Sequence, residues 1–119
     1  MKIERFEAIE GWKLGRELTK MIYAATRQPE FARDFGLKDQ ITRAAGSVMH
    51  SIAKGLNGGS NAEFTKFLRY AQRSASEVQS QLYIALDQNY ITQELYDLAK
   101  HAHAKVGGFI AYLVRSDKK

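Results

Sequence analysis

Residues 61–88 repeat apolar or small side chains at alternating spacings of four and three, and this repeat constrains the fold more than any other feature. Ser60, followed three residues later by Glu63, matches a capping box and predicts where the helix begins. The stripe consists of Phe64, Leu68, Ala71, Ala75, Val78, Leu82 and Ala85. A helix with such a stripe is stabilised mainly by packing against other helices, so the repeat predicts a helical bundle.

Helical spacing recurs in three other segments, with glycine, proline and asparagine between them. The four helices are expected at residues 9–26, 37–56, 61–88 and from Thr92 onward. Pro29 ends the first helix, because proline disfavours the helical conformation of the residue before it. Phe31 and Phe35 are expected to anchor the connector at 30–36 on the bundle. Gly107 and Gly108 are expected to mark a kink or a close helix contact.

Four helices with short connections predict an all-α fold, an antiparallel up-down-up-down four-helix bundle. No linker divides the sequence, so the prediction is one domain over residues 1–119. Beside the apolar stripe, the third helix carries a second, more polar stripe of Phe67, Ser74, Gln81 and Ile84. A small bundle cannot cover every side of so long a helix, so we expect this second stripe to contact another copy of the chain.

Positive charge is concentrated in the middle of the chain, which has a net charge of +5. Residues 36–75 contain six basic and two acidic side chains, whereas the segments on either side are nearly balanced. A basic region attracts nucleic acid, an anionic membrane surface or an acidic protein. The alternative is a solvated surface that only keeps the protein soluble.

One face of the third helix is both basic and aromatic. Lys66, Arg69 and Arg73 recur at spacings of three and four and therefore share that face, with Tyr70 among them. Such a face can hold a nucleic-acid backbone and stack on a base, although three cations are also ordinary surface decoration. The candidate nucleic-acid-binding residues are Arg43, Lys54, Lys66, Arg69 and Arg73.

The turn at residues 58–60 allows two interpretations. A phosphate could bind at the start of the third helix, where free amides and the helix dipole favour anions. A helix C-cap, a tight turn and a capping box explain the same residues without any ligand, and this is the simpler interpretation.

No motif in the sequence indicates catalysis. No two of the three histidines are spaced four apart, and neither a nucleophile elbow nor a phosphate-binding glycine–lysine loop occurs. Asp97 and His101 are four apart and could share a metal, but a surface pair is the simpler interpretation. We therefore expect a protein without enzymatic activity, cofactor or metal site.

Cysteine is absent, which excludes disulfides and cysteine-ligated metal sites. No apolar run approaches the roughly 18 residues that cross a bilayer. The N-terminal segment alternates charged and apolar residues, unlike a signal peptide. These features predict a cytoplasmic protein that does not contact a membrane.

Four short segments together resemble one known family. The matching residues are Phe6, Ile9 and Trp12; Gly36, Leu37, Gln40, Ile41, Arg43, Ala44 and Ala45; Ile52, Ala53 and Gly55; and Glu63, Phe64, Phe67, Leu68, Ala71 and Ser74. Over roughly residues 3–98, the chain resembles the four-helix-bundle proteins encoded within intervening sequences of bacterial 23S ribosomal RNA genes. Met49 and Ser51 replace a proline and an asparagine that are frequent in this family, and Lys54 replaces a glutamate.

The resemblance implies an all-α bundle that assembles as a ring, a homopentamer. The chain is also similar to the accessory variability proteins of diversity-generating retroelements, which are basic pentamers that bind nucleic acid and a reverse transcriptase. Two functions therefore remain open at this point. The first is a non-enzymatic protein that binds structured RNA or DNA, and the second is a scaffold that binds a protein partner and no nucleic acid.

Overall fold

The computed structural model describes residues 3–117, and over that range the chain contains helices and turns but no strand. This confirms the expected all-α fold. The elements are a short 3-10 helix, η1 (Phe6–Ala8), and the α-helices α1 (Glu10–Thr26), α2 (Pro29–Arg33), α3 (Phe35–Asn57), α4 (Asn61–Asp87) and α5 (Gln93–Asp117).

Local side-chain chemistry fixes several helix ends. Pro29 occupies the first turn of α2, where its missing N–H costs no hydrogen bond. The Asp34 carboxylate accepts a hydrogen bond from the Leu37 amide at 3.3 Å and caps α3. The Ser60 hydroxyl accepts one from the Glu63 amide at 3.1 Å and caps α4, as the capping-box pattern predicts. Gly59 makes the turn between α3 and α4 with a φ of 86°, which favours glycine.

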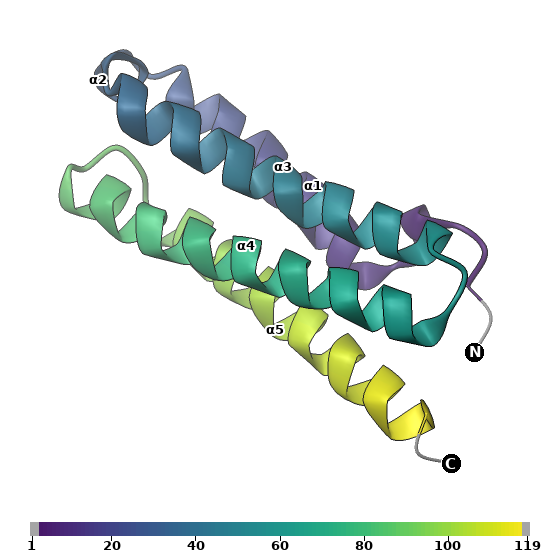
Figure 1. The fold of residues 1–119 in the computed structure, drawn as a ribbon. Helices are drawn as coiled ribbons and strands as arrows, with labels where there is room; N and C mark the ends of the chain where they lie inside the picture. The colour runs from purple at the N-terminus through teal and green to yellow at the C-terminus, as the bar shows by residue number, and fades with distance from the viewer. Residues whose placement is uncertain (1–2, 118–119) are drawn as a thin grey trace.

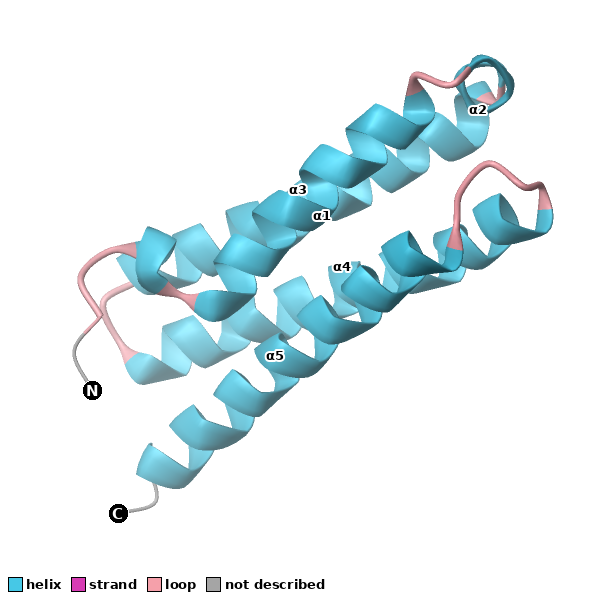
Figure 2. Cartoon of the chain, turned by 180° about the vertical axis from the view of Figure 1, so that it is seen from behind, coloured by secondary structure: helices cyan, strands magenta, loops and turns pink. Residues whose placement is uncertain are grey.

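The four long helices form an elongated bundle whose Cα extents are 51 × 20 × 20 Å. Both α1 and α4 pack against α3 and α5, so α1 and α4 occupy opposite corners of the bundle (Figure 1). Figure 2 shows the α3–α4 turn and the α4–α5 turn at opposite ends. Each long helix therefore keeps one outward face along most of its length.

Two clusters of buried side chains fill the bundle. The first, toward α2, includes Ile22, Phe31 and Leu82, and the second, toward the α3–α4 turn, includes Ile52, Leu68 and Val106. Burial of such side chains contributes about 1.5–3 kcal/mol each relative to leaving them exposed. The apolar stripe of α4 faces this core throughout, which confirms the pattern that predicts the bundle.

The connector between α1 and α3 differs from the expectation. Residues 29–33 form the short helix α2, and Phe31 anchors it, fully buried and stacked on the Tyr90 ring at 4.8 Å between centroids. Phe35 does not anchor the connector: it is the first residue of α3 and its side chain is 72% exposed. The expectation for Phe35 is wrong because the Asp34 cap starts α3 two residues earlier and turns Phe35 outward.

The second stripe of the third helix, α4, is less exposed than the sequence suggests. Gln81 is buried, and the Ser74 hydroxyl donates to that of Ser47 on α3 at 2.9 Å. Phe67 packs so closely against α3 that a Cβ on Gly55 would lie 2.8 Å from its own Cβ. Only Ile84 is exposed, at 50%. Within one chain, α3 therefore partly covers Phe67 and Ser74, and Gln81 is buried, so Ile84 is the most exposed residue of the stripe. Contact of this stripe with another copy stays a prediction.

The two adjacent glycines of α5 behave differently from each other. The helix continues through both of them. A Cβ on Gly107 would lie 2.6 Å from the Gln72 amide nitrogen, whereas a Cβ on Gly108 would meet nothing within 4 Å. The close helix contact expected here is therefore found at Gly107.

Among the described residues, no helix combines the length and apolar character that a membrane span requires.

Candidate nucleic-acid interface

The outward face of α4 carries the basic row that the sequence predicts. Lys66, Arg69 and Arg73 are all exposed, because the apolar stripe on the other side of α4 is turned to the core. The Arg73 guanidinium lies over the Tyr70 ring, with its Cζ 5.5 Å from the centroid. Tyr70 remains 37% exposed, so this row presents cations together with an accessible aromatic ring.

Arg43 and Lys54 lie on the exposed face of α3, the helix that packs beside α4. Both border a hollow of about 540 Å³, to which α1 contributes Tyr23 and α3 contributes His50. A neighbouring hollow of about 520 Å³ reaches α4, where Ser74 and Glu77 line it together with Arg43. The five candidate residues thus form two rows on adjacent helices, one on α3 and one on α4.

Nearby carboxylates neutralise part of this charge. Arg43 pairs with Asp39 at 2.6 Å and Lys66 pairs with Glu63 at 3.7 Å. Within residues 3–117, Lys54, Arg69 and Arg73 have no ion-pair partner. Exposed pairs are weak, about 0–1 kcal/mol, so a phosphate can displace either carboxylate.

Sequence reasoning missed Tyr23 and His50 as neighbours of the α3 row. His50 lies four residues before Lys54 and seven after Arg43, so helical spacing alone could have placed it on their face. Tyr23 comes from α1, and its position depends on how α1 packs against α3. No spacing within one helix could have indicated it.

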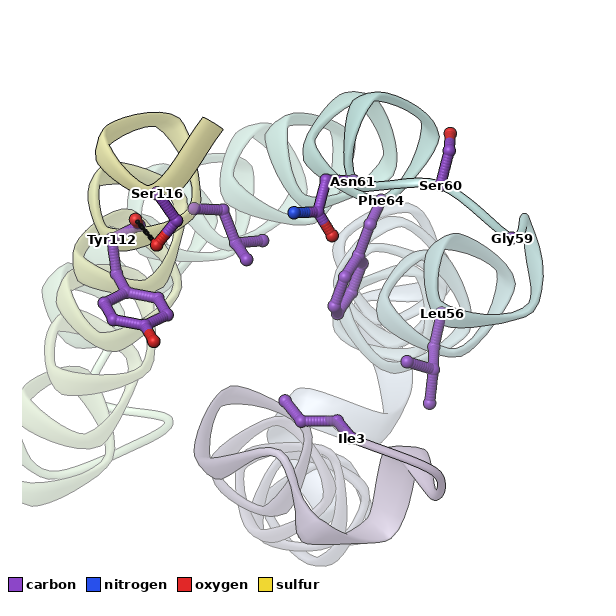
Figure 3. Close-up of a pocket in the computed structure, with 9 residues that line it drawn as sticks. Ile3, Leu56, Gly59, Ser60, Asn61, Phe64, Tyr112 and Ser116 are labelled. Atoms are coloured by element: carbon purple, nitrogen blue, oxygen red, sulfur yellow. Dashed lines mark hydrogen bonds between the residues drawn. The ribbon is translucent and has the colours of Figure 1, made fainter. Parts of the chain in front are cut away.

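The turn between α3 and α4 lies beside a small, partly apolar pocket of about 270 Å³ (Figure 3). Phe64 and Ile3 point toward this pocket, whereas Ser60 points away from it, consistent with its role as the α4 cap. The cap and the positive φ of Gly59 account for the turn, as the simpler interpretation expects.

The residues considered for metal chemistry are not gathered into a site. The Asp97 carboxylate accepts a hydrogen bond from the side-chain amide of Gln93 at 3.1 Å, and His101 is exposed on α5. No group of three or more histidine, aspartate or glutamate side chains suited to a metal ion occurs within residues 3–117.

Comparisons with known proteins agree with the fold and with the resemblance. A sequence profile described as "23S rRNA-intervening sequence protein" matches residues 7–111. A crystal structure from the S23 ribosomal protein family of Bacteroides thetaiotaomicron VPI-5482, described as a protein with unknown function, superposes with a TM-score of 0.71 and 20% identity. The superposition covers 87% of this chain and 97% of the other. No curated protein matches the chain significantly.

Proposed function

This chain belongs to the 23S rRNA-intervening sequence protein family, and from that premise we propose that it is a non-enzymatic cytoplasmic protein that binds structured RNA or DNA. The single observation that carries the proposal is the exposed basic row on α4. Lys66, Arg69 and Arg73 lie there beside the Tyr70 ring. Arg43 and Lys54 on α3 extend the same interface.

The chemistry of the interface is contact with phosphates. Lysine and arginine side chains that neutralise phosphates release counterions, so binding weakens linearly on a logarithmic salt scale. Three such contacts give a slope of about −2.7 on double-stranded nucleic acid. Tyr70 adds a stacking surface that accepts any base, so we expect strong salt dependence and little sequence specificity.

A charge-reversal variant tests the proposal. We expect Lys66→Glu/Arg69→Glu/Arg73→Glu to lose at least about tenfold in affinity for an RNA stem-loop in gel shifts at two salt concentrations. The matched control, Lys100→Glu/Lys105→Glu/Arg115→Glu, changes the net charge equally on the exposed side of α5. Equal affinity of the α4 variant and wild type would refute the assignment of this row.

We propose further that the long helices run up-down-up-down and that the protein is a homo-oligomer. Short turns between helices in contact support the antiparallel order. The family resemblance supports a pentameric ring. Light scattering coupled to chromatography measures the assembly, and a mass near 13.5 kDa at micromolar concentration would exclude the ring.

The alternative function is a scaffold that binds a protein partner and no nucleic acid. Two exposed apolar side chains on α4, Tyr83 at 56% and Ile84 at 50%, favour this candidate because exposed apolar surface is buried in protein contacts. Retention on heparin followed by RNA gel shifts separates the two functions. A scaffold would show no salt-dependent affinity for RNA beyond that of a neutral control protein.

A further inference from the structure

A second basic row lies on α1, in a part of the chain whose overall charge is nearly balanced. Lys13, Arg16 and Lys20 are spaced by three and four residues, and all are exposed on the side of α1 opposite its buried residues. Arg27 follows seven residues later at the end of the helix, also exposed. At 1.5 Å per residue, Lys13 to Lys20 extends over about 10 Å, as does the row on α4, and Arg27 lengthens the α1 row to about 21 Å.

The three cations of this row have acidic groups nearby but are not paired with them. Within the part of the chain that is described, Lys13, Arg16 and Lys20 form no ion pair. The acidic residues of α1 are Glu10, three residues before Lys13, and Glu17, which lines the same hollow as the row, as does Glu7, which is paired with Arg5 at 3.5 Å. On α4, by contrast, Lys66 is already paired with Glu63.

The row borders a hollow of about 480 Å³ that also contains an aromatic ring. Trp12 lines the hollow together with Lys13, Arg16 and Lys20. The Arg16 guanidinium lies 6.0 Å from the Trp12 ring centroid, and Phe6 packs on the same ring at 5.1 Å. Cations beside an aromatic ring that is held in place are the combination that binds phosphates and bases together. The Arg73–Tyr70 pair on α4 repeats this combination.

The two rows cannot contact one short ligand at the same time. α1 and α4 occupy opposite corners of the bundle, and both rows face outward. The bundle between them has a Cα width of 20 Å. Two separate segments of nucleic acid could therefore be held on opposite sides of a single chain.

We propose that the outward face of α1 is a second nucleic-acid-binding surface, on which Lys13, Arg16 and Lys20 contact phosphates beside Trp12. The inference rests on the proposed function for the class of ligand, but not for the residues involved. With both rows occupied, one chain bridges two segments of RNA or DNA.

Trp12 is the only tryptophan in the chain, so its fluorescence reports on the α1 surface alone. The full-length protein is titrated with a short RNA stem-loop while Trp12 emission and affinity are followed. We expect wild type to show saturable quenching of Trp12. We expect Lys13→Glu/Arg16→Glu/Lys20→Glu to lose that quenching and to bind one RNA fewer per chain, while the salt slope of the remaining α4 site stays the same.

Three further variants separate this inference from the proposed function. Lys66→Glu/Arg69→Glu/Arg73→Glu should bind one RNA fewer per chain and keep the Trp12 response. The control Lys100→Glu/Lys105→Glu/Arg115→Glu should keep the wild-type number of RNAs per chain and the Trp12 response. The milder Lys13→Gln/Arg16→Gln/Lys20→Gln should also lose quenching, and both α1 variants should keep the helical circular dichroism of wild type, which excludes misfolding as the cause.

Three results would count against these ideas in different ways. Wild-type stoichiometry and quenching in the α1 variants would overturn the second surface, even if the α4 variant lost binding. Unchanged affinity and stoichiometry in the α4 variant, with binding lost in the α1 variants, would overturn the α4 assignment and leave the second surface standing. Absence of RNA binding by wild type would overturn both.

Discussion

Gly55 occupies a point where α3 and α4 approach too closely for a side chain. A Cβ there would lie 2.8 Å from the Phe67 Cβ and 3.0 Å from the Phe64 ring, inside van der Waals contact. We expect Gly55→Ala to lower the free energy of unfolding by about 1–3 kcal/mol in urea denaturation. Gly108→Ala is the control: its Cβ meets nothing within 4 Å, so it should gain up to about 1 kcal/mol from helix propensity. A stabilised Gly55→Ala variant would contradict this packing.

Tyr90 joins the α4–α5 turn to the start of α3. Its hydroxyl donates to the Asp34 carboxylate at 3.0 Å. Desolvation, and then the hydrogen bond and charge of Asp34, raise the pKa of Tyr90 above its ordinary value. The neutral hydroxyl is therefore favoured in the folded protein, and its contribution to stability is complete below the ordinary pKa near 10. That contribution is lost as the pH rises through the raised pKa.

Replacing Tyr90 should change the alkaline side of the stability profile. We expect Tyr90→Phe to be less stable than wild type near neutral pH and to lose less stability above pH about 10. Urea midpoints across that range measure the difference. Tyr112→Phe is the control, because no hydrogen bond of the Tyr112 hydroxyl is found within residues 3–117. Parallel profiles for Tyr90→Phe and wild type would exclude this role for the Tyr90–Asp34 contact.

At the scale of one element, the start of α4 depends on Ser60. Ser60→Ala removes the acceptor for the Glu63 amide, and we expect a loss of about 1 kcal/mol in the free energy of unfolding. Ser80→Ala, at an exposed position within the same helix, should change stability by only a few tenths of a kcal/mol. Equal stability of the two variants in urea would show that the cap is not needed.

The ends of the helices were predictable because the signals are local. The Ser60 hydroxyl and the Glu63 amide set the start of α4 through a hydrogen bond three residues apart, and Pro29 ends the α1 segment by its steric effect on Gln28. The exposed face of α4 was predictable for the same reason, since helical periodicity places Lys66, Arg69 and Arg73 together. The exposure of Phe35 was not predictable, because an aromatic side chain is expected to be buried, whereas the Asp34 cap starts α3 at Phe35 and turns its side chain outward.

What could not be predicted is which helix covers a given side. Periodicity gives the angle of Ser74 and Gln81 around α4. The contact of Ser74 with Ser47 of α3 and the burial of Gln81 depend on how the helices pack together. The basic row of α1 was missed for a related reason. The net charge of residues 1–35 hides it, because the acidic residues there, both beside the row (Glu17) and away from it (Glu30), nearly cancel the basic charge in the sum.

For the whole molecule, the exposed apolar residues bear on assembly. Ile84 is half exposed at the outward side of α4, and burying it would favour contact between copies. We expect Ile84→Glu to shift the mass measured by light scattering toward 13.5 kDa. Ala24→Glu, which adds the same charge at an exposed position of α1, should not. Identical masses for wild type and Ile84→Glu would place the contact between copies elsewhere.

The packing of α1 against α5 has a consequence for the order in which the chain folds. Helices α3 and α4 are consecutive and joined by a three-residue turn, whereas Gly11 meets Val106, a residue near the opposite end of the sequence. Local contacts close with less loss of chain entropy than distant ones, so the α3–α4 hairpin should form first and the α1–α5 seam last. Reversible opening should begin at that seam. In native-state hydrogen exchange, the central amides of α3 and α4 should then exchange more slowly than those of α1 and α5.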